Sequence, residues 1–129
     1  MELRNISKAE LDKIIDNHKL WLKTNGEKGE RANLRSANLR YANLSSADLS
    51  SADLDYSAFP LWCGGLNVHI DDKQATQLLY HLVRNVTYSK NTSAKLKRLC
   101  KIKSIVKQAN EFHRVEECGK IEEQKGGEA

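Results

Sequence analysis

Residues 32–56 read ANLRS ANLRY ANLSS ADLSS ADLDY, and this stretch decides the fold. Leucine recurs every five residues, at positions 34, 39, 44, 49 and 54, with Ala two positions and Asn or Asp one position before it. Five is a multiple of neither the 3.6-residue period of an α-helix nor the two-residue period of a strand. The stretch therefore indicates a repeat architecture rather than an amphipathic helix or an alternating strand.

The pattern A(N/D)LXX closely resembles that of the pentapeptide-repeat superfamily over residues 32–56, and more weakly as far as residue 61. The resemblance implies a right-handed quadrilateral β-helix, in which four pentapeptides make one square coil and the Ala and Leu side chains point inward. Residues twenty apart should then stack at ~4.8 Å, the spacing of paired strands. Arg35 would lie on Asp55, so the basic residue would meet an acidic one.

The repeat is short for a structure of this kind. Residues 27–61 supply about one and a half coils, and solenoid units bury their apolar faces only against neighbours or caps. A helix predicted at about residues 8–23, opened by a capping box from Ser7 to Glu10, would cover the first coil with its apolar stripe. The expected fold class is therefore α+β: a short β-helix with an N-terminal capping helix and a C-terminal helical pair.

The chain changes character at Phe59–Leu66, which contains its only proline and a glycine pair. Such residues mark a break in architecture. We expect a short strand at Leu66–Ile70, a helix opened by Asp71 and a third helix from about Ser93 to His113. The second helix should bury an apolar stripe at helical spacing, made of Ala75, Leu78, Leu79, Leu82 and Val86. The broader apolar arc of the third helix indicates burial on two sides or a homodimer interface.

Length and composition, 129 residues with 40% apolar and 29% charged, are those of one globular domain. We expect a single domain over 1–129, made of a capping helix (1–25), the repeat (27–61), a helical region (62–115) and a disordered tail (116–129). There is no signal-peptide pattern and no apolar run near the ~20 residues of a membrane span. Three cysteines form no even framework, so we expect a cytoplasmic protein with reduced thiols and no membrane partner.

The positive charges are unevenly distributed. Between Lys73 and Asn110 the sequence contains no Asp or Glu, and a local positive field attracts phosphate backbone, acidic protein or membrane surface. The predicted binding patch (the basic patch) lies on the third helix and consists of Lys95, Lys97, Arg98, Lys101, Lys103 and Lys107. The alternative is a solvated helix whose charge is offset by the acidic residues that follow position 110.

A secondary recognition surface is expected on the repeat at Arg35, Arg40 and Tyr41, with Asp55 as a competing partner for Arg35. No metal site and no cofactor are expected, because Cys and His occur without CxxC or HxxxH spacing and are spread over three elements. The sequence has no nucleophile elbow, phosphate loop or HExxH motif. These features predict a binding protein rather than an enzyme.

Residues 27–83, including the sequence PLWCGGL, are similar to small pentapeptide-repeat proteins of phages and prophages of Gram-positive bacteria. The resemblance favours a phage-encoded, anti-CRISPR-like inhibitor that docks through the basic helix on a host nucleic-acid enzyme or immune effector in the host cytoplasm. Two alternatives remain open: direct nucleic-acid binding and a structural phage protein. Mimicry of duplex DNA, known in the family, is disfavoured because this repeat is short and carries Arg35 and Arg40.

Overall fold

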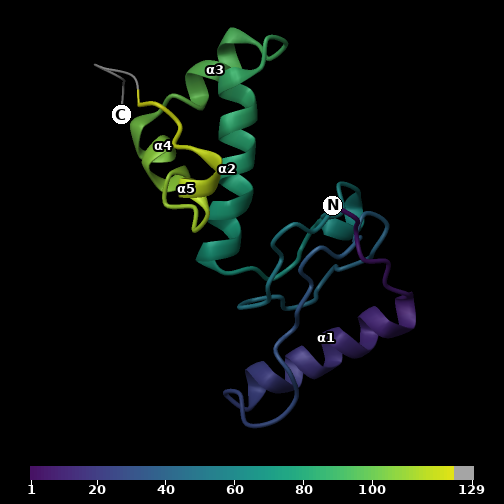
Figure 1. Ribbon diagram of the computed structural model, residues 1–129. Helices are drawn as coiled ribbons and strands as arrows, with labels where there is room; N and C mark the ends of the chain where they lie inside the picture. The colour runs from purple at the N-terminus through teal and green to yellow at the C-terminus, as the bar shows by residue number, and fades with distance from the viewer. Residues whose placement is uncertain (124–129) are drawn as a thin grey trace. The chain divides into compact units, whose positions relative to one another are not determined.

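The computed structural model describes residues 1–123, which fall into two compact units. The first unit, Met1–Asp71, contains helix α1 (Lys8–Lys23), the repeat segment (residues 32–61) and the 3₁₀ helix η1 (Cys63–Gly65) (Figure 1). The second unit begins at Asp72. It contains four helices: α2 (Asp72–Tyr88), α3 (Ala94–Leu99), α4 (Lys103–Ala109) and α5 (Val115–Cys118). Within residues 1–123, none of the helices has the length and apolarity needed to cross a membrane.

Helix α1 forms where the sequence predicts it. The Ser7 side chain accepts the backbone N–H of Glu10 at 3.1 Å, which satisfies one of the free donors of the first turn. Leu11 is buried, and Ile14 and Ile15 pack beside it against the buried Ala and Leu side chains of the repeat segment. Helix α1 thus covers part of the buried core of the repeat segment.

The repeat segment winds so that residues about twenty positions apart lie together. The Leu34 N–H donates to the Asp53 C=O at 2.9 Å, and the Asp53 N–H donates to the Ala32 C=O at 3.2 Å. Asn33 and Asp53 therefore form a parallel pair. The leucines of the first coil are all fully buried in one core, at positions 34, 39, 44 and 49. The predicted inward direction of these leucines is confirmed.

The predicted fold class is nevertheless wrong. The described residues contain five α-helices and one 3₁₀ helix but no strand and no sheet, so neither the β-helix nor the strand at Leu66–Ile70 is present. Hydrogen bonds join the coils, but the paired residues of the described chain are isolated parallel pairs rather than a continuous ladder. Left-handed residues such as Ser36, Ser46 and Ser51, with φ of 61°, 68° and 70°, turn the backbone at the repeat corners before consecutive pairs accumulate into a ladder.

Helix α2 starts one residue after the predicted Asp71 and buries only part of the predicted stripe: Val86 is in the core and Leu79 packs against it. Leu78 and Leu82, expected in the core, are 40% and 59% exposed, whereas Tyr80 and Val83 are buried. The Tyr80 ring stacks on Phe112, which lies just beyond α4, with 4.7 Å between ring centroids. Packing against α3 and α4 thus selects the face with the aromatic and β-branched residues.

The predicted third helix, Ser93–His113, is broken into two. Helix α3 ends at its C-cap Cys100, and α4 starts at Lys103. The break allows Cys100 and Phe112 to join one core with the α2 residues. In one straight helix, the apolar residues would cover more than half of the circumference. A single core could then bury only some of them.

Residues 116–123, predicted to be disordered, pack against the second unit. Ile121 is 2% exposed, and the Asn110 side chain both donates to the Ile121 C=O and accepts the Ile121 N–H, each at 2.9 Å. Arg84 donates to the backbone carbonyls of Cys118 and Gly119, both at 2.8 Å. The rest of the predicted tail, residues 124–129, lies outside the described residues.

Candidate functional site

A groove of about 560 Å³ lies on the first unit, between the start of α1 and the repeat segment. Its size is in the range of protein binding pockets. The apolar side chains that line it come from both elements: Ile6, Leu11, Leu39, Ala42 and Trp62. Lys8 and Asp12, an ion pair at 3.0 Å, lie along one side of the groove. This groove can therefore receive an apolar group and present polar contacts around it.

Trp62 is held at the groove by the repeat geometry. Its Nε1–H donates to the C=O of Ala42, twenty residues earlier, at 3.1 Å. A Cβ on Gly64 would collide with the Trp62 ring and lie 2.8 Å from the Ala42 oxygen, so only glycine fits there. Trp62 is still 49% exposed. Trp62 therefore lies at the surface and not in the core.

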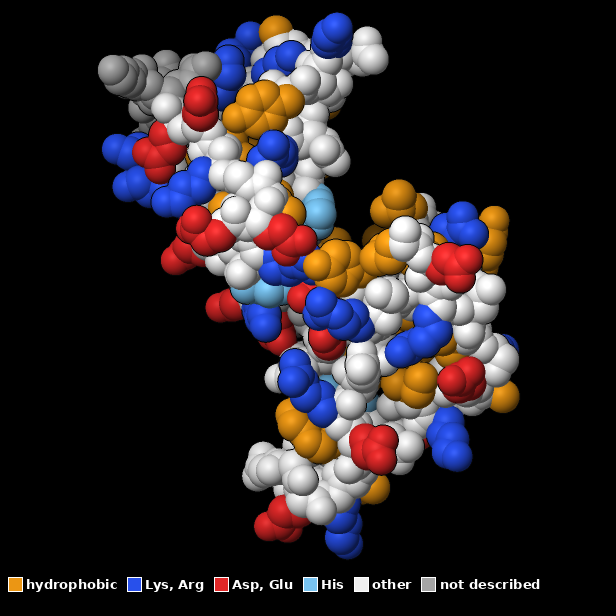
Figure 2. Space-filling model, viewed as in Figure 1, with side chains coloured by type: hydrophobic (Ala, Val, Ile, Leu, Met, Phe, Trp, Pro, Cys, Tyr) orange, Lys and Arg blue, Asp and Glu red, His pale blue; other side chains and the backbone are white. Residues whose placement is uncertain are grey.

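The glycine pair also changes the register of the second coil. Asn33 pairs with Asp53, but Asp48 pairs with His69, one residue further along than the repeat period requires. The additional residue enters between Gly64, whose C=O accepts the Leu44 N–H twenty residues earlier, and Asn67, whose C=O accepts the Ser46 N–H. Leu61 is fully exposed beside Trp62, at the same repeat position as the exposed Tyr41 twenty residues earlier. Figure 2 shows hydrophobic side chains on the surface of the first unit.

The three residues of the secondary surface predicted on the repeat do not form one site in the structure. Arg35 lies 3.6 Å from both Asp53 and Asp55, so its competing partner is present as expected. Tyr41 is 86% exposed and lines the groove. The Arg40 guanidinium lies 5.8 Å from the Tyr41 ring centroid, and cations at this distance are attracted to the ring face. Arg40 and Tyr41 therefore adjoin the groove, while Arg35 is engaged elsewhere.

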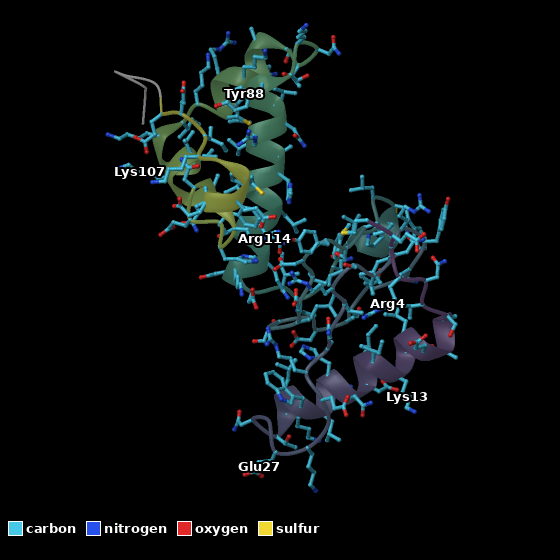
Figure 3. All side chains as sticks on the ribbon, viewed as in Figure 1. Arg4, Lys13, Glu27, Tyr88, Lys107 and Arg114 are labelled. Atoms are coloured by element: carbon cyan, nitrogen blue, oxygen red, sulfur yellow. The ribbon has the colours of Figure 1, made fainter. Side chains whose placement is uncertain are left out.

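The basic patch does not share one helix, because the predicted third helix is broken. Three of its residues lie on α3 (Lys95, Lys97 and Arg98), Lys101 lies between the helices, and Lys103 and Lys107 lie on α4. Figure 3 shows Lys107 at the outer side of the second unit. Lys97 and Lys101 line a cavity of about 640 Å³ that Glu122 and Glu123 also line. Acidic residues after position 110 thus lie near part of the basic patch. This is the arrangement expected if they offset its positive charge.

Two side chains have shifted acid–base properties. Burial raises the pKa of the Cys100 thiol, which favours its neutral form, while Cys63 and Cys118 are exposed and all three cysteines are free. Partial burial raises the pKa of the Asp48 carboxyl, but hydrogen bonds from Ser50 and the charge of His69 outweigh this and lower it overall. Within the part of the chain described, no three His, Cys, Asp or Glu side chains gather as metal ligands would.

Sequence reasoning missed Trp62 as a surface residue and His18 as a polar contact in the core. The repeat register carried no such signal for Trp62, because the position twenty residues after Ala42 is one whose side chain points inward in the repeat. For His18, the apolar stripe of α1 suggested burial but carried no sign of its two backbone partners, Ala32 and Ser50. Both assignments depend on contacts between distant parts of the chain.

Comparison with known proteins adds one relationship. Residues 30–59 match the family model described as pentapeptide repeats (8 copies), which confirms the predicted superfamily for this segment. The match ends before Pro60, so it does not extend to Trp62, the glycine pair or the second unit. No curated protein and no solved structure matches the chain. The similarity to phage and prophage proteins is therefore unsupported.

Proposed function

Because this chain carries pentapeptide repeats, and such repeats generally form protein-interaction domains, we propose that it is a non-enzymatic binding protein. The groove beside Trp62 is the docking site for its partner. The observation that carries the proposal is the position of Trp62, which is half exposed although a hydrogen bond and a required glycine hold it in place.

The chemistry of the groove suits protein recognition. Tryptophan and tyrosine supply large contact areas at a small entropic cost, and they are enriched among the residues that dominate binding energy. Here Trp62 and Tyr41 lie beside an apolar floor that includes Leu11 and Leu39. The floor is already formed by α1 and the first coil, so a partner would not have to order it.

The test is affinity capture from bacterial lysate treated with nuclease, using the wild-type chain and two groove variants, Trp62→Ala and Tyr41→Ala. Tyr56→Ala is the matched control, because Tyr56 occupies the same repeat position as Tyr41 but packs under Arg35. We expect the partner to bind Trp62→Ala at least roughly tenfold more weakly, as for a typical interface anchor, and to bind Tyr56→Ala normally. Equal capture by wild type and Trp62→Ala would rule out this site.

The finer function expected from the sequence, an anti-CRISPR-like phage inhibitor of a host nucleic-acid enzyme or immune effector, stays a prediction, as does a cytoplasmic location. Homodimer formation also stays a prediction. Leu96 and Leu99 on α3 are exposed and would supply its interface. A sedimentation experiment on the wild-type chain and on Leu99→Ala tests this, and a monomer at all concentrations would contradict it.

Direct nucleic-acid binding is the second candidate, supported by the exposed Lys95, Arg98 and Lys103. Binding to random-sequence DNA should weaken steeply with salt, because each neutralised phosphate releases counterions. Replacing Lys95 and Lys103 with Ala should reduce the salt dependence, whereas replacing Lys13 and Lys19 of α1 should not. Binding that does not respond to salt or to these substitutions would remove this candidate.

A further inference from the structure

The first coil of the repeat segment has one end facing α1, and several backbone groups at this end have partners in the N-terminal region. His18 contacts the Ala32 N–H and the Ser50 C=O. The Arg4 guanidinium donates to the Asn33 C=O at 2.6 Å. Open ends of stacked extended chain present unpaired donors and acceptors, and here side chains from the N-terminal region satisfy them.

Arg4 also pairs with the coil through its backbone. Its N–H donates to the Ser36 C=O at 2.7 Å, and its C=O accepts the Asn38 N–H at 2.9 Å. Arg4 therefore forms a parallel pair with Ala37, and Figure 3 shows it between the repeat segment and α1. The N-terminal segment thus adds one extended layer on this face of the coil. It leaves the edge at Ser7, where α1 begins.

The next face of the coil offers the same pair of groups. The Tyr41 C=O and the Asn43 N–H stand five residues after the Ser36 C=O and the Asn38 N–H, at equivalent repeat positions. Among residues 1–123, neither group makes a hydrogen bond. Both Tyr41 and Asn43 line the groove beside Trp62. An open donor and acceptor in this spacing form a template for an extended chain.

Charge also distinguishes this face from its neighbour. Arg35 and Arg40 follow the leucine of consecutive repeats, but Arg35 is paired with Asp53 and Asp55. Within the described residues, Arg40 has no carboxylate partner and contacts only Asn38 and the Tyr41 ring. A ligand on this face would therefore meet one positive charge free to pair with a carboxylate.

We propose that the groove binds an extended segment of a partner protein by backbone pairing. One residue of the segment donates its N–H to the Tyr41 C=O and accepts the Asn43 N–H, as Arg4 does one repeat earlier. An adjacent apolar side chain enters the groove beside Trp62, and an acidic side chain pairs with Arg40. The layer begun by Arg4 is thereby continued. The inference rests on the binding function proposed above and adds its mode and the chemistry of its ligand.

The test uses a phage-displayed library of random peptides selected on the full-length chain. Selected peptides should contain an acidic residue close to an apolar one and should bind Trp62→Ala at least roughly tenfold more weakly. Arg40→Gln should also weaken binding, whereas Arg35→Gln, the matched control in the preceding repeat, should not. N-methylation of the single peptide residue that pairs with Tyr41 should lower affinity roughly tenfold. Hydrogen exchange of the Asn43 amide, followed by NMR, should slow in the complex.

The outcomes separate the binding mode from the binding function. Peptides that depend on Trp62 but leave Asn43 exchange unchanged, and that tolerate N-methylation at every residue, would overturn backbone pairing while the groove remained a binding site. Failure to select any peptide that depends on Trp62 would overturn both. A chain that dimerises in sedimentation, with the dimer lost in Trp62→Ala, would assign this edge to a second copy and would overturn the proposal.

Discussion

The Nδ1 atom of His18 accepts the backbone N–H of Ala32 at 3.0 Å. Nδ1 therefore carries no proton, and the neutral ring donates from Nε2 to the Ser50 C=O at 2.8 Å. The imidazole is fully buried and stacks on Trp21, with ring centroids 5.7 Å apart. A single side chain of α1 thus joins the two ends of the first coil.

Replacing His18 with Ala should lower the free energy of unfolding by about 2–4 kcal/mol, because two backbone groups lose their partner in a buried site. Urea denaturation measures the change. Lys19→Ala, a substitution at the exposed neighbouring position of α1, is the control and should change stability by no more than about 0.5 kcal/mol. Equal urea midpoints for wild type and His18→Ala would contradict the bridging role.

Gly64→Ala should destabilise the first unit by about 1–3 kcal/mol, the usual cost of forcing an atom into packed surroundings. The new methyl group would overlap the Trp62 ring and the Ala42 carbonyl, so the ring must move. Tryptophan fluorescence and urea denaturation report the two effects. Cys63→Ala, at the exposed neighbouring position, should leave both unchanged. An unaltered spectrum for Gly64→Ala would show that the groove does not depend on this glycine.

Asp48 should contribute a pH dependence to stability. Its folded pKa is lowered, so its contribution is present above the unfolded pKa of about 4 and is lost as the pH falls through the lower folded value. Asp48→Asn keeps an acceptor for the Ser50 N–H, as Asn43 does for Ser45, but cannot titrate. The urea midpoint of wild type should therefore fall more steeply below about pH 4 than that of Asp48→Asn.

The comparison needs a second carboxylate as a control. Asp16→Asn removes an exposed carboxylate on α1 and should leave the acid slope of wild type intact. Parallel slopes for wild type and Asp48→Asn would contradict the assigned role of Asp48.

Ile121→Ala should lower the free energy of unfolding by about 2–4 kcal/mol, as expected for truncation of a buried aliphatic side chain. Circular dichroism during urea denaturation follows the helices of the second unit. Leu96→Ala, at a half-exposed position on α3, is the control and should have a much smaller effect. An Ile121→Ala variant as stable as wild type would restore the prediction that the chain is disordered after residue 116.

The features that sequence predicted correctly are local or periodic. Ser7 and Glu10 form a cap through a contact three residues apart, which is visible in the sequence alone. The five-residue period places Asn33 beside Asp53 and Arg35 beside Asp55, because a constant period repeats the same displacement at every turn. The superfamily followed from the same period.

The predictions that were wrong concern which face of a helix is buried, where a helix ends and whether stacked coils form strands. Of the apolar stripe predicted on α2, Val86 is in the core, but Leu78 and Leu82 are exposed, and Tyr80 stacks on Phe112 instead. The break after Cys100 was missed, because the apolar pattern continues across it. The fold class was wrong because periodic stacking was taken to imply strands, whereas left-handed corner residues leave only isolated pairs.

For the candidate site, the amino-acid order established which groups exist: a five-residue register, an arginine at position 40 and a tryptophan two residues before a glycine pair. Only the tertiary structure decided that Arg35 is neutralised while Arg40 is not, and that Trp62 stands at a groove rather than in the core. Register and capping depend on neighbours along the chain. Exposure and pairing depend on which distant segments pack against a residue in the folded structure. The order of the amino acids along the chain does not specify those contacts by itself.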